Sequence, residues 1–309
     1  MEETLQENNI EAVQKEVVQK RRFWELDFVR GLCVILMVLD HFLYSVMDVM
    51  PMVDAMLGKT VWVSASAWVL DHYWYNKLRI TVRFFVLGAF FTLCGISCTF
   101  SRSNLKRGST CFLVGCGITF VTVLIDRIFD MGLSIYFGVL HMLGLSMLVY
   151  GLLQKCGDVI AKIGKKDKTK KITRAIGDYL APAVGLVLII VYFACWYSGI
   201  DGDSFATNVS PESKTASMLA SLFVNVKPQL YGYIVGGADY WPLLPWAAFV
   251  LLGGAIGVAL YRSKAKNYLA PLDGKWNKPV CFVGRHALFI YVAHQVAVVA
   301  ILFLLTLIL

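Results

Sequence analysis

The chain has 309 residues, of which 58% are hydrophobic and only 16% are charged. Soluble domains contain about 45–50% apolar and about 25% charged residues, so the composition excludes an ordinary soluble domain and predicts an integral membrane protein. The net charge of +8 at pH 7 would suit a nucleic-acid-binding protein, but membrane topology explains it better, and we expect no nucleic-acid partner.

Residues 1–22 form a polar tail that ends in Lys20, Arg21 and Arg22. We expect a surface helix or a disordered arm, because the apolar run that follows is too long for a signal peptide and lacks a small-residue cleavage site. Residues 23–309 are expected to form a single transmembrane domain. A membrane-spanning helix needs about 20 mostly apolar residues. The segments that qualify are 24–48, 80–100, 109–126, 133–153, 179–197, 243–261 and 281–308. The predicted fold is therefore an all-α bundle of about seven transmembrane helices.

Lysine and arginine are concentrated in alternate loops. They are frequent in the tail and in the expected loops 101–108, 155–178 and 262–280, and sparse in 49–79 and 198–242. The positive-inside rule then places the N-terminus in the cytoplasm and the C-terminus outside. An additional span at 55–70 would invert every later loop, and Lys59 argues against it.

The first apolar segment, "FVRGLCVILMVLDHFLYSV", contains Arg30, Asp40 and His41. A charge at mid-membrane depth costs about 3 kcal/mol on insertion scales, so such residues usually line a cavity or a substrate path. In a helix, the eleven steps from Arg30 to His41 place both residues on one face, about 16 Å apart. Asp27 joins that face and can pair with Arg30, whereas Asp40 lies to the side. The alternatives are that Arg30 extends to the inner headgroups and that His41 bonds a neighbouring helix.

Further polar residues lie within or beside the other apolar segments. His141 and His294 are inside two of them, Arg285 is at the inner end of the last one, and His72 is in the first outer loop. No histidine pair has the spacing of a metal site, so we expect no metal. No phosphate-binding loop, nucleophile elbow or dinucleotide fingerprint is present.

The stretch "ADYWPLLPW" brings Asp239, Tyr240 and Trp246 together where the sixth segment meets the outer face. These residues either frame an entrance for a substrate or form an aromatic belt at the membrane interface. Arg83 in the second segment is grouped with them as a cavity residue.

"ELDFVRGLCVILMVLDHF" resembles the opening helix of the membrane acyltransferases, in which an arginine is followed eleven positions later by a histidine. Four later stretches resemble the heparan-α-glucosaminide N-acetyltransferase catalytic-domain group within them: "RFFVLGAFFTLCGISCTFS", "YFGVLHMLGLSML", "DYWPLLPWAAFVLLGGAIG" and "GRHALFIYVAHQ". The resemblance covers about residues 22–305. It implies transfer of an acyl group from cytoplasmic acetyl-CoA to an acceptor on the far side of the bilayer, either a sugar or a glycan amine or hydroxyl.

The resemblance also implies roles for individual residues. Arg30, Asp27 and Arg285 would bind the anionic donor. His41, next to Asp40, would be the general base. The animal lysosomal enzyme resembles this chain but has an asparagine at the position of His41 and its histidine farther along in the luminal loop, which makes His72 the second candidate.

His141, His294, Arg83, Asp239, Tyr240 and Trp246 would line the acceptor side. We expect a multi-pass protein of a bacterial cytoplasmic membrane. The alternative function is a secondary transporter in which intramembrane histidine and arginine residues bind protons or substrate. The sequence contains no inverted repeat and no matched pair of broken helices of the kind such transporters use.

Overall fold

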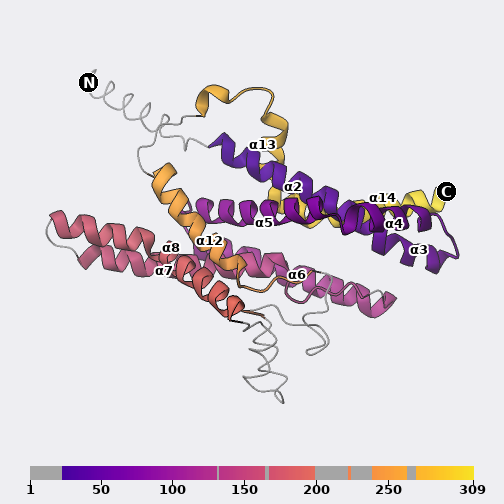
Figure 1. Cartoon of the computed structure of the whole chain (residues 1–309), viewed down its shortest axis with the longest axis horizontal. Helices are drawn as coiled ribbons and strands as arrows, with labels where there is room; N and C mark the ends of the chain where they lie inside the picture. The colour runs from indigo at the N-terminus through magenta and orange to yellow at the C-terminus, as the bar shows by residue number, and fades with distance from the viewer. Residues whose placement is uncertain (1–22, 131, 164–166, 199–221, 224–238, 263–268) are drawn as a thin grey trace, which may run out of the picture.

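The computed structural model describes residues 23–130, 132–163, 167–198, 222–223, 239–262 and 269–309, and every regular element in these ranges is a helix (Figure 1). Six helices of this part of the chain are long and apolar enough to cross a membrane. They are Trp24–Leu57, Lys77–Cys98, Asn104–Phe129, Val139–Ile163, Thr169–Cys195 and Ala287–Ile308. A seventh apolar helix, Trp246–Tyr261, is shorter. The predicted all-α membrane bundle is therefore confirmed.

The first span is longer than the sequence predicted. Helix α2 (Trp24–Tyr44) continues through the π-helical turn η1 (Ser45–Val49) into α3 (Met50–Leu57). Gly58 then reverses the chain with φ +64, a conformation that glycine adopts without strain. The chain folds back as α4 (Val63–Val69) and η2 (Leu70–Trp74). Much of the expected outer loop 49–79 is thus helical.

This helical hairpin packs against the end of α14 (Ala287–Ile308). Met50 of α3 and Leu302 of α14 are buried in the same apolar cluster. Lys59 Nζ donates to the backbone oxygen of Thr306 at 2.6 Å, and Trp62 Nε1 donates to the Thr306 hydroxyl at 2.6 Å. A lysine at the carboxyl end of a helix satisfies free carbonyl groups and complements the helix dipole. These contacts attach the hairpin to α14.

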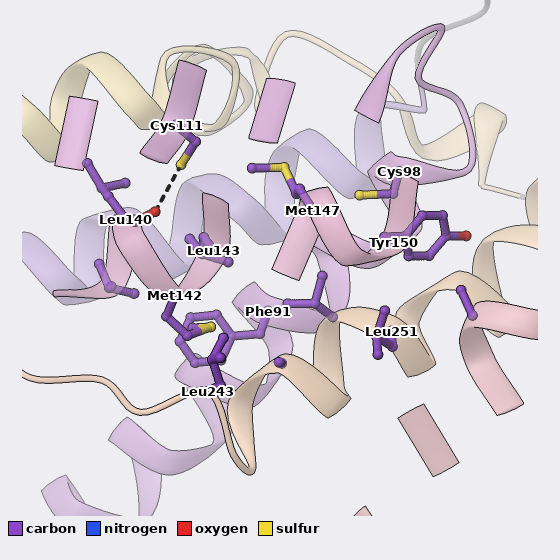
Figure 2. Close-up of a cluster of buried hydrophobic side chains, with 14 of the residues drawn as sticks. Phe91, Cys98, Cys111, Leu140, Met142, Leu143, Met147, Tyr150, Leu243 and Leu251 are labelled. Atoms are coloured by element: carbon purple, nitrogen blue, oxygen red, sulfur yellow. Dashed lines mark hydrogen bonds between the residues drawn. The ribbon is translucent and has the colours of Figure 1, made fainter. Parts of the chain in front are cut away.

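The larger core joins α5 (Lys77–Cys98), α7 (Val139–Ile163) and α12 (Trp246–Ile256). Phe91, Met142 and Leu251 are almost completely buried in it, and Figure 2 shows Phe91 and Met142 next to Leu243. Helix α12 begins at Trp246, because Pro242 and Pro245 lack the backbone N–H that a helix interior requires. The helix continues through η3 (Gly257–Arg262). This start explains why the sixth apolar segment is shorter than a full span.

Helices α6 (Asn104–Phe129), α7 and α8 (Asp167–Tyr197) extend beyond the predicted apolar segments. The expected cytoplasmic loop 155–178 is largely helical, since α7 continues to Ile163 and α8 begins at Asp167. A Cβ atom on either Gly157 or Gly177 would overlap the backbone oxygen of the other residue, so the two helices are in close contact there. This contact, together with helix-favouring lysines, accounts for a helical hairpin where hydropathy predicted a loop.

The last predicted segment, 281–308, is divided into α13 (Lys278–Arg285) and α14 at His286. The short α13 follows the 3₁₀ turn η4 (Ala270–Leu272) and lies against α2 (Figure 1). A Cβ atom on Gly284 would overlap the backbone oxygen of Asp27, and one on Gly31 would overlap that of Val280. Because both crossing points are glycines, α13 is in backbone contact with α2, and this contact positions Arg285 beside Asp27 and Arg30.

Candidate active site

A cavity of about 2520 Å³ extends along α2 and is lined by residues of α2, α5, α6 and α14. Its lining reaches from Asp27 at one end of α2 to Met56 in α3 beyond the other end. Eight of the residues expected at the site contribute to the lining. They are Asp27, Arg30, Asp40, His41, Arg83, Asp239, Arg285 and His294.

One end of the cavity is strongly basic. Arg30 donates to Asp27 Oδ1 at 3.1 Å and to the Ser97 hydroxyl of α5 at 2.7 Å, which confirms the predicted Asp27–Arg30 pair. Arg285 donates through Nε to the Cys281 backbone oxygen at 3.1 Å, and its side chain is exposed. The basic residues that line this end are Arg30, Arg102, Lys106, Arg107 and Arg285. We call these five side chains the basic end. They offer several guanidinium groups to an anion with more than one phosphate.

Farther along α2, two histidines are in direct contact. His41 Nδ1 lies 2.9 Å from His294 Nε2 of α14, and the two rings stack with their centroids 4.9 Å apart. His294 Nδ1 lies 2.7 Å from the backbone oxygen of Tyr291 and 3.2 Å from that of Ile290. His294 is 9% exposed. Sequence reasoning named both histidines but did not pair them.

The hydrogen-bond pattern determines where the protons lie. A backbone oxygen only accepts, so His294 Nδ1 carries a proton, and the neutral ring then has a free lone pair on Nε2. That lone pair accepts from His41 Nδ1–H. The remaining nitrogen of His41, Nε2, is therefore unprotonated in the neutral pair and can accept a proton from another molecule.

Asp40 is engaged by partners other than His41. Arg79 of α5 donates to both carboxylate oxygens, at 2.8 and 2.9 Å, and the Tyr73 hydroxyl donates at 3.0 Å. The Arg79 guanidinium also lies over the Trp74 ring, 3.8 Å from its centroid. Bidentate pairs of this kind fix geometry as well as adding stability. Asp40 therefore joins α2 to Tyr73 of η2 and to Arg79 of α5.

Asp239 lies at the point where α7 and α14 meet the segment before α12. Its carboxylate accepts from the Val139 backbone N–H at 3.1 Å, from the Tyr291 hydroxyl at 3.3 Å and from Trp241 Nε1. Burial raises the pKa of the Asp239 carboxyl, although these three donors favour its ionised form. The backbone oxygen of Tyr291 also binds His294, so Asp239 helps to position the histidine pair.

Arg83 lines the same cavity one helical turn beyond Arg79. Its guanidinium carbon is 5.9 Å from the Trp241 ring centroid, and its side chain is exposed. Arg30 and Arg79 each pair with a carboxylate, at 3.1 and 2.8 Å. Among the residues that the structure describes, none forms a hydrogen bond or ion pair with the side chain of Arg83.

Four expected site residues do not line the cavity. His141 is 4% exposed, accepts from the Gly138 backbone N–H at 3.2 Å and stacks on Phe137. His72 is exposed in η2 and stacks on Trp68. Trp246 packs against other aromatic rings of the large core, and Tyr240 lies next to Asp239 outside the lining.

Sequence reasoning missed Ser97, Arg79, Tyr291 and Gln295 as parts of the site. A signal for Arg79 was present, because Arg79 and Arg83 lie four residues apart on one face of a mostly apolar helix. Two arginines in such a helix are as unusual as Arg30 is in the first apolar segment. Gln295 Nε2 donates to the Ser45 hydroxyl at 3.1 Å. Its side-chain oxygen, Oε1, is buried without a hydrogen-bond partner among the described residues. Within the described ranges, no group of three or more His, Cys, Asp or Glu residues could hold a metal ion.

Comparisons with known proteins give one finding. The family model described as heparan-alpha-glucosaminide N-acetyltransferase, catalytic, matches residues 22–164 and 205–296. Comparisons with curated proteins and with solved structures found no match. The matched residues include both histidines of the pair and all five cations of the basic end. The chain therefore belongs to the heparan-alpha-glucosaminide N-acetyltransferase catalytic-domain family, a family of membrane acetyltransferases.

Proposed function

We propose that this protein transfers an acetyl group from cytoplasmic acetyl-CoA to an amine or hydroxyl of a sugar-containing acceptor on the other side of the membrane, with His41 as the general base. The observation that carries the proposal is the His41–His294 hydrogen bond of 2.9 Å in a cavity that also contains the basic end. The cavity thus combines an anion-binding region with an oriented base.

The basic end suits the phosphates of CoA. Its five cations come from α2, from the start of α6 with the turn before it, and from α13, so three separate parts of the chain contribute positive charge to the cavity. Arg30 and His41 are eleven residues apart on α2, or about 16 Å along the helix axis. The extended pantetheine arm of CoA spans a distance of this order. A donor bound through its phosphates at the basic end would bring its thioester close to His41.

The histidine pair suggests how the reaction proceeds. His41 Nε2 takes a proton from the acceptor, and the acceptor nitrogen or oxygen attacks the thioester carbonyl carbon. The carbon–sulfur bond then breaks, and His41 returns the proton to the CoA thiolate. His294 accepts from His41 Nδ1–H throughout, as the aspartate of a hydrolase triad does for its histidine. In this scheme Arg30 and Arg285 bind the donor, and Asp40 holds α2 in position.

Orientation follows from the loop charges. The basic end would face the cytoplasm, where acetyl-CoA is made, and the hairpin of α3 and α4 would face outward. The expected location is the cytoplasmic membrane of a bacterium.

The test uses purified protein reconstituted into vesicles with radiolabelled acetyl-CoA supplied on one side and acceptor on the other. Transfer should require donor at the basic end, and His41→Ala should reduce turnover by about 10²–10⁴-fold, the usual contribution of a general base. Donor binding and thermal unfolding of the variant should stay close to wild type. His72→Ala should retain activity. Near-normal turnover of both His41→Ala and His41→Asn would exclude His41 as the base, and substrate uptake without acetyl transfer would identify a transporter instead.

A further inference from the structure

We infer that the acceptor is a membrane lipid, namely a lipid-linked sugar with an anionic phosphate headgroup, whose apolar chain lies between α6 and α14 and whose charge binds Arg83. This inference rests on the proposed acetyltransferase function and specifies the class of its acceptor. The basic end, which would bind the donor, is not part of this acceptor site. Three features of the cavity carry the inference: its apolar far wall, its opening towards the bilayer and its unpaired arginine.

Beyond the histidine pair, the cavity is lined by two apolar stripes. On α6 they are Val121, Ile125 and Phe129, and on α14 they are Val296, Val299 and Phe303. The residues recur every three or four positions, so each stripe occupies one helix face. None of the six side chains has a hydrogen-bonding group. A water-soluble glycan is recognised mainly by such groups, whereas a hydrocarbon chain requires none.

The same stripes are accessible from the bilayer. Val121 is 52% exposed and Phe129 is 51% exposed, although both line the cavity. On α14 Val296 is 73% exposed and is also a lining residue. Such large exposed fractions at lining residues indicate that the cavity is not closed over these stripes. Since α6 and α14 are both long and apolar enough to cross a membrane, we infer that the cavity opens here to the hydrocarbon region, so that a lipid chain enters from the side without crossing water.

Arg83 provides the charge complementarity. It lines the cavity and lies within electrostatic range of His41, Asp40 and Asp239, but it forms no ion pair with either carboxylate. Unlike Arg30 and Arg79, it has no carboxylate partner within the described part of the chain. An unpaired cation at membrane depth is costly, and a guanidinium matches a phosphate with two parallel hydrogen bonds.

The phosphates of a donor at the basic end are too far away to compensate the charge of Arg83. Arg30 of the basic end contacts Ser97 of α5, and Ser97 is fourteen residues from Arg83, or about 21 Å along that helix. Two separate anion-binding regions thus flank the histidine pair along the cavity. One suits the donor, and the other suits an acceptor that brings its own negative charge.

The acceptor then delivers its sugar to His41. Its hydroxyl or amine loses a proton to His41 Nε2 as the new carbon–oxygen or carbon–nitrogen bond forms. The thioester carbon–sulfur bond breaks, and CoA leaves as the thiol after it takes that proton. The products are an acetylated lipid-linked sugar and CoA, and no further reactant is required.

The experiment offers the full-length protein two kinds of acceptor. One set of vesicles is made from total bacterial membrane lipid, which contains lipid-linked sugars, and the other from phosphatidylcholine with glucosamine and a soluble glucosamine oligosaccharide added outside. Radiolabelled acetyl-CoA is supplied on the side of the membrane that the basic end faces. After extraction, the label is counted in the organic and aqueous phases. We expect His41-dependent label in the organic phase, released by mild acid as a water-soluble acetylated sugar.

The other outcomes separate the two proposals. Label found only in the soluble sugars would overturn the proposal of a lipid acceptor and leave the acetyltransferase function intact. Label in the organic phase that mild acid does not release would show an acetylated bulk lipid and overturn the proposal of a lipid-linked sugar. No label in either phase would overturn the proposed function itself.

Variants test the two contacts separately. Ile125→Trp narrows the apolar stripe of α6, whereas Leu124→Trp adds the same bulk at a neighbouring exposed residue that does not line the cavity. Ile125→Trp should raise the KM for the lipid acceptor with the acetyl-CoA KM unchanged, and Leu124→Trp should not. Arg83→Gln should raise the same KM by about tenfold or more, the usual effect of losing a charged hydrogen bond, and Arg83→Lys should recover part of the loss. Equal kinetics for the two tryptophan variants, at equal thermal stability, would overturn the apolar site.

Discussion

At the scale of single residues, the partner of the proposed base is a second imidazole. In hydrolase triads a carboxylate fixes the tautomer of the histidine, and here a backbone-anchored His294 does so through one nitrogen lone pair. A carboxylate remains an acceptor over the working pH range, but His294 ceases to accept once its Nε2 is protonated. The histidine pair therefore couples the orientation of the base to acidity.

His294 should act as a positioning residue, and replacing it tests this role. We expect His294→Ala to reduce kcat by about 10–10²-fold, as loss of an orienting partner commonly does, with the KM for acetyl-CoA unchanged. His294→Gln keeps an oxygen that can accept from His41 Nδ1–H, so it should recover part of the activity. The measurement is steady-state kinetics across pH with thermal unfolding of each variant. A fall in stability without loss of turnover per folded molecule would show that the contact is only structural.

Asp40 provides a second test at this scale. Asp40→Asn removes the charge that compensates Arg79, so we expect a loss of about 1.5–3 kcal/mol in the free energy of unfolding, the range for hydrogen bonds to charged groups. Turnover per folded molecule should change little, because Asp40 bonds Arg79 and Tyr73.

The double variant Asp40→Asn with Arg79→Gln is the control. If the ion pair is the source of the loss, the double variant should be less destabilised than the sum of the two single variants. A collapse of kcat at unchanged stability would instead make Asp40 part of the catalytic machinery.

At the scale of elements, the crossing of α2 and α13 determines the geometry of the basic end. We expect Gly284→Ala to separate the helices, because the added Cβ would overlap the Asp27 backbone oxygen. The variant should unfold at a lower temperature and bind acetyl-CoA more weakly, since Arg285 is displaced with α13. Gly88→Ala on α5 is the matched control, because a Cβ there meets nothing within 4 Å. It should be neutral or stabilising by up to about 1 kcal/mol. Equal stability of the two variants would contradict the assigned role of the crossing.

Hydropathy located the apolar elements but not their ends. The Asp27–Arg30 pair was predictable because both residues lie within one helical turn. The extensions of α7 and α8 were not, because polar residues form those turns and packing between Gly157 and Gly177 supports them. The break at His286 was also missed, since apolar residues of 281–283 and of 287–290 lie on either side of the short polar stretch Arg285 and His286.

Only the part of the site that lies within a single helix was predictable from the sequence. The eleven-residue spacing placed Arg30 and His41 on one face, and both line the cavity. The His41–His294 bond and the Asp40–Arg79 pair join different helices, and no sequence period encodes which helices become neighbours. For His141 the sequence predicted a site residue that the structure does not place in the cavity. This histidine of an apolar segment is packed in the core.

At the scale of the whole molecule, orientation can be tested with a native cysteine. Cys156 is exposed on α7 near Gln154, which bonds Asn104 at the basic end. A membrane-impermeant maleimide should label Cys156 only after cells are permeabilised, as judged by mass spectrometry of the labelled peptide. Tyr75→Cys, at a residue that is 72% exposed between η2 and α5, should be labelled in intact cells. The reverse pattern would place the basic end outside and remove the proposed access to cytoplasmic donor.

The histidine pair also has a consequence for biosynthesis. His41 and His294 are 253 positions apart in the chain, so the ribosome delivers α2 to the membrane long before it makes α14. Until α14 inserts, His41 lacks His294 as a partner, so in the proposed mechanism a nascent chain would not activate an acceptor. Chains that stop before His294 would retain Arg30 but lack an oriented base. Under the proposed mechanism, acetyl transfer therefore starts only after α14 has been translated, and a nascent chain would not consume acetyl-CoA.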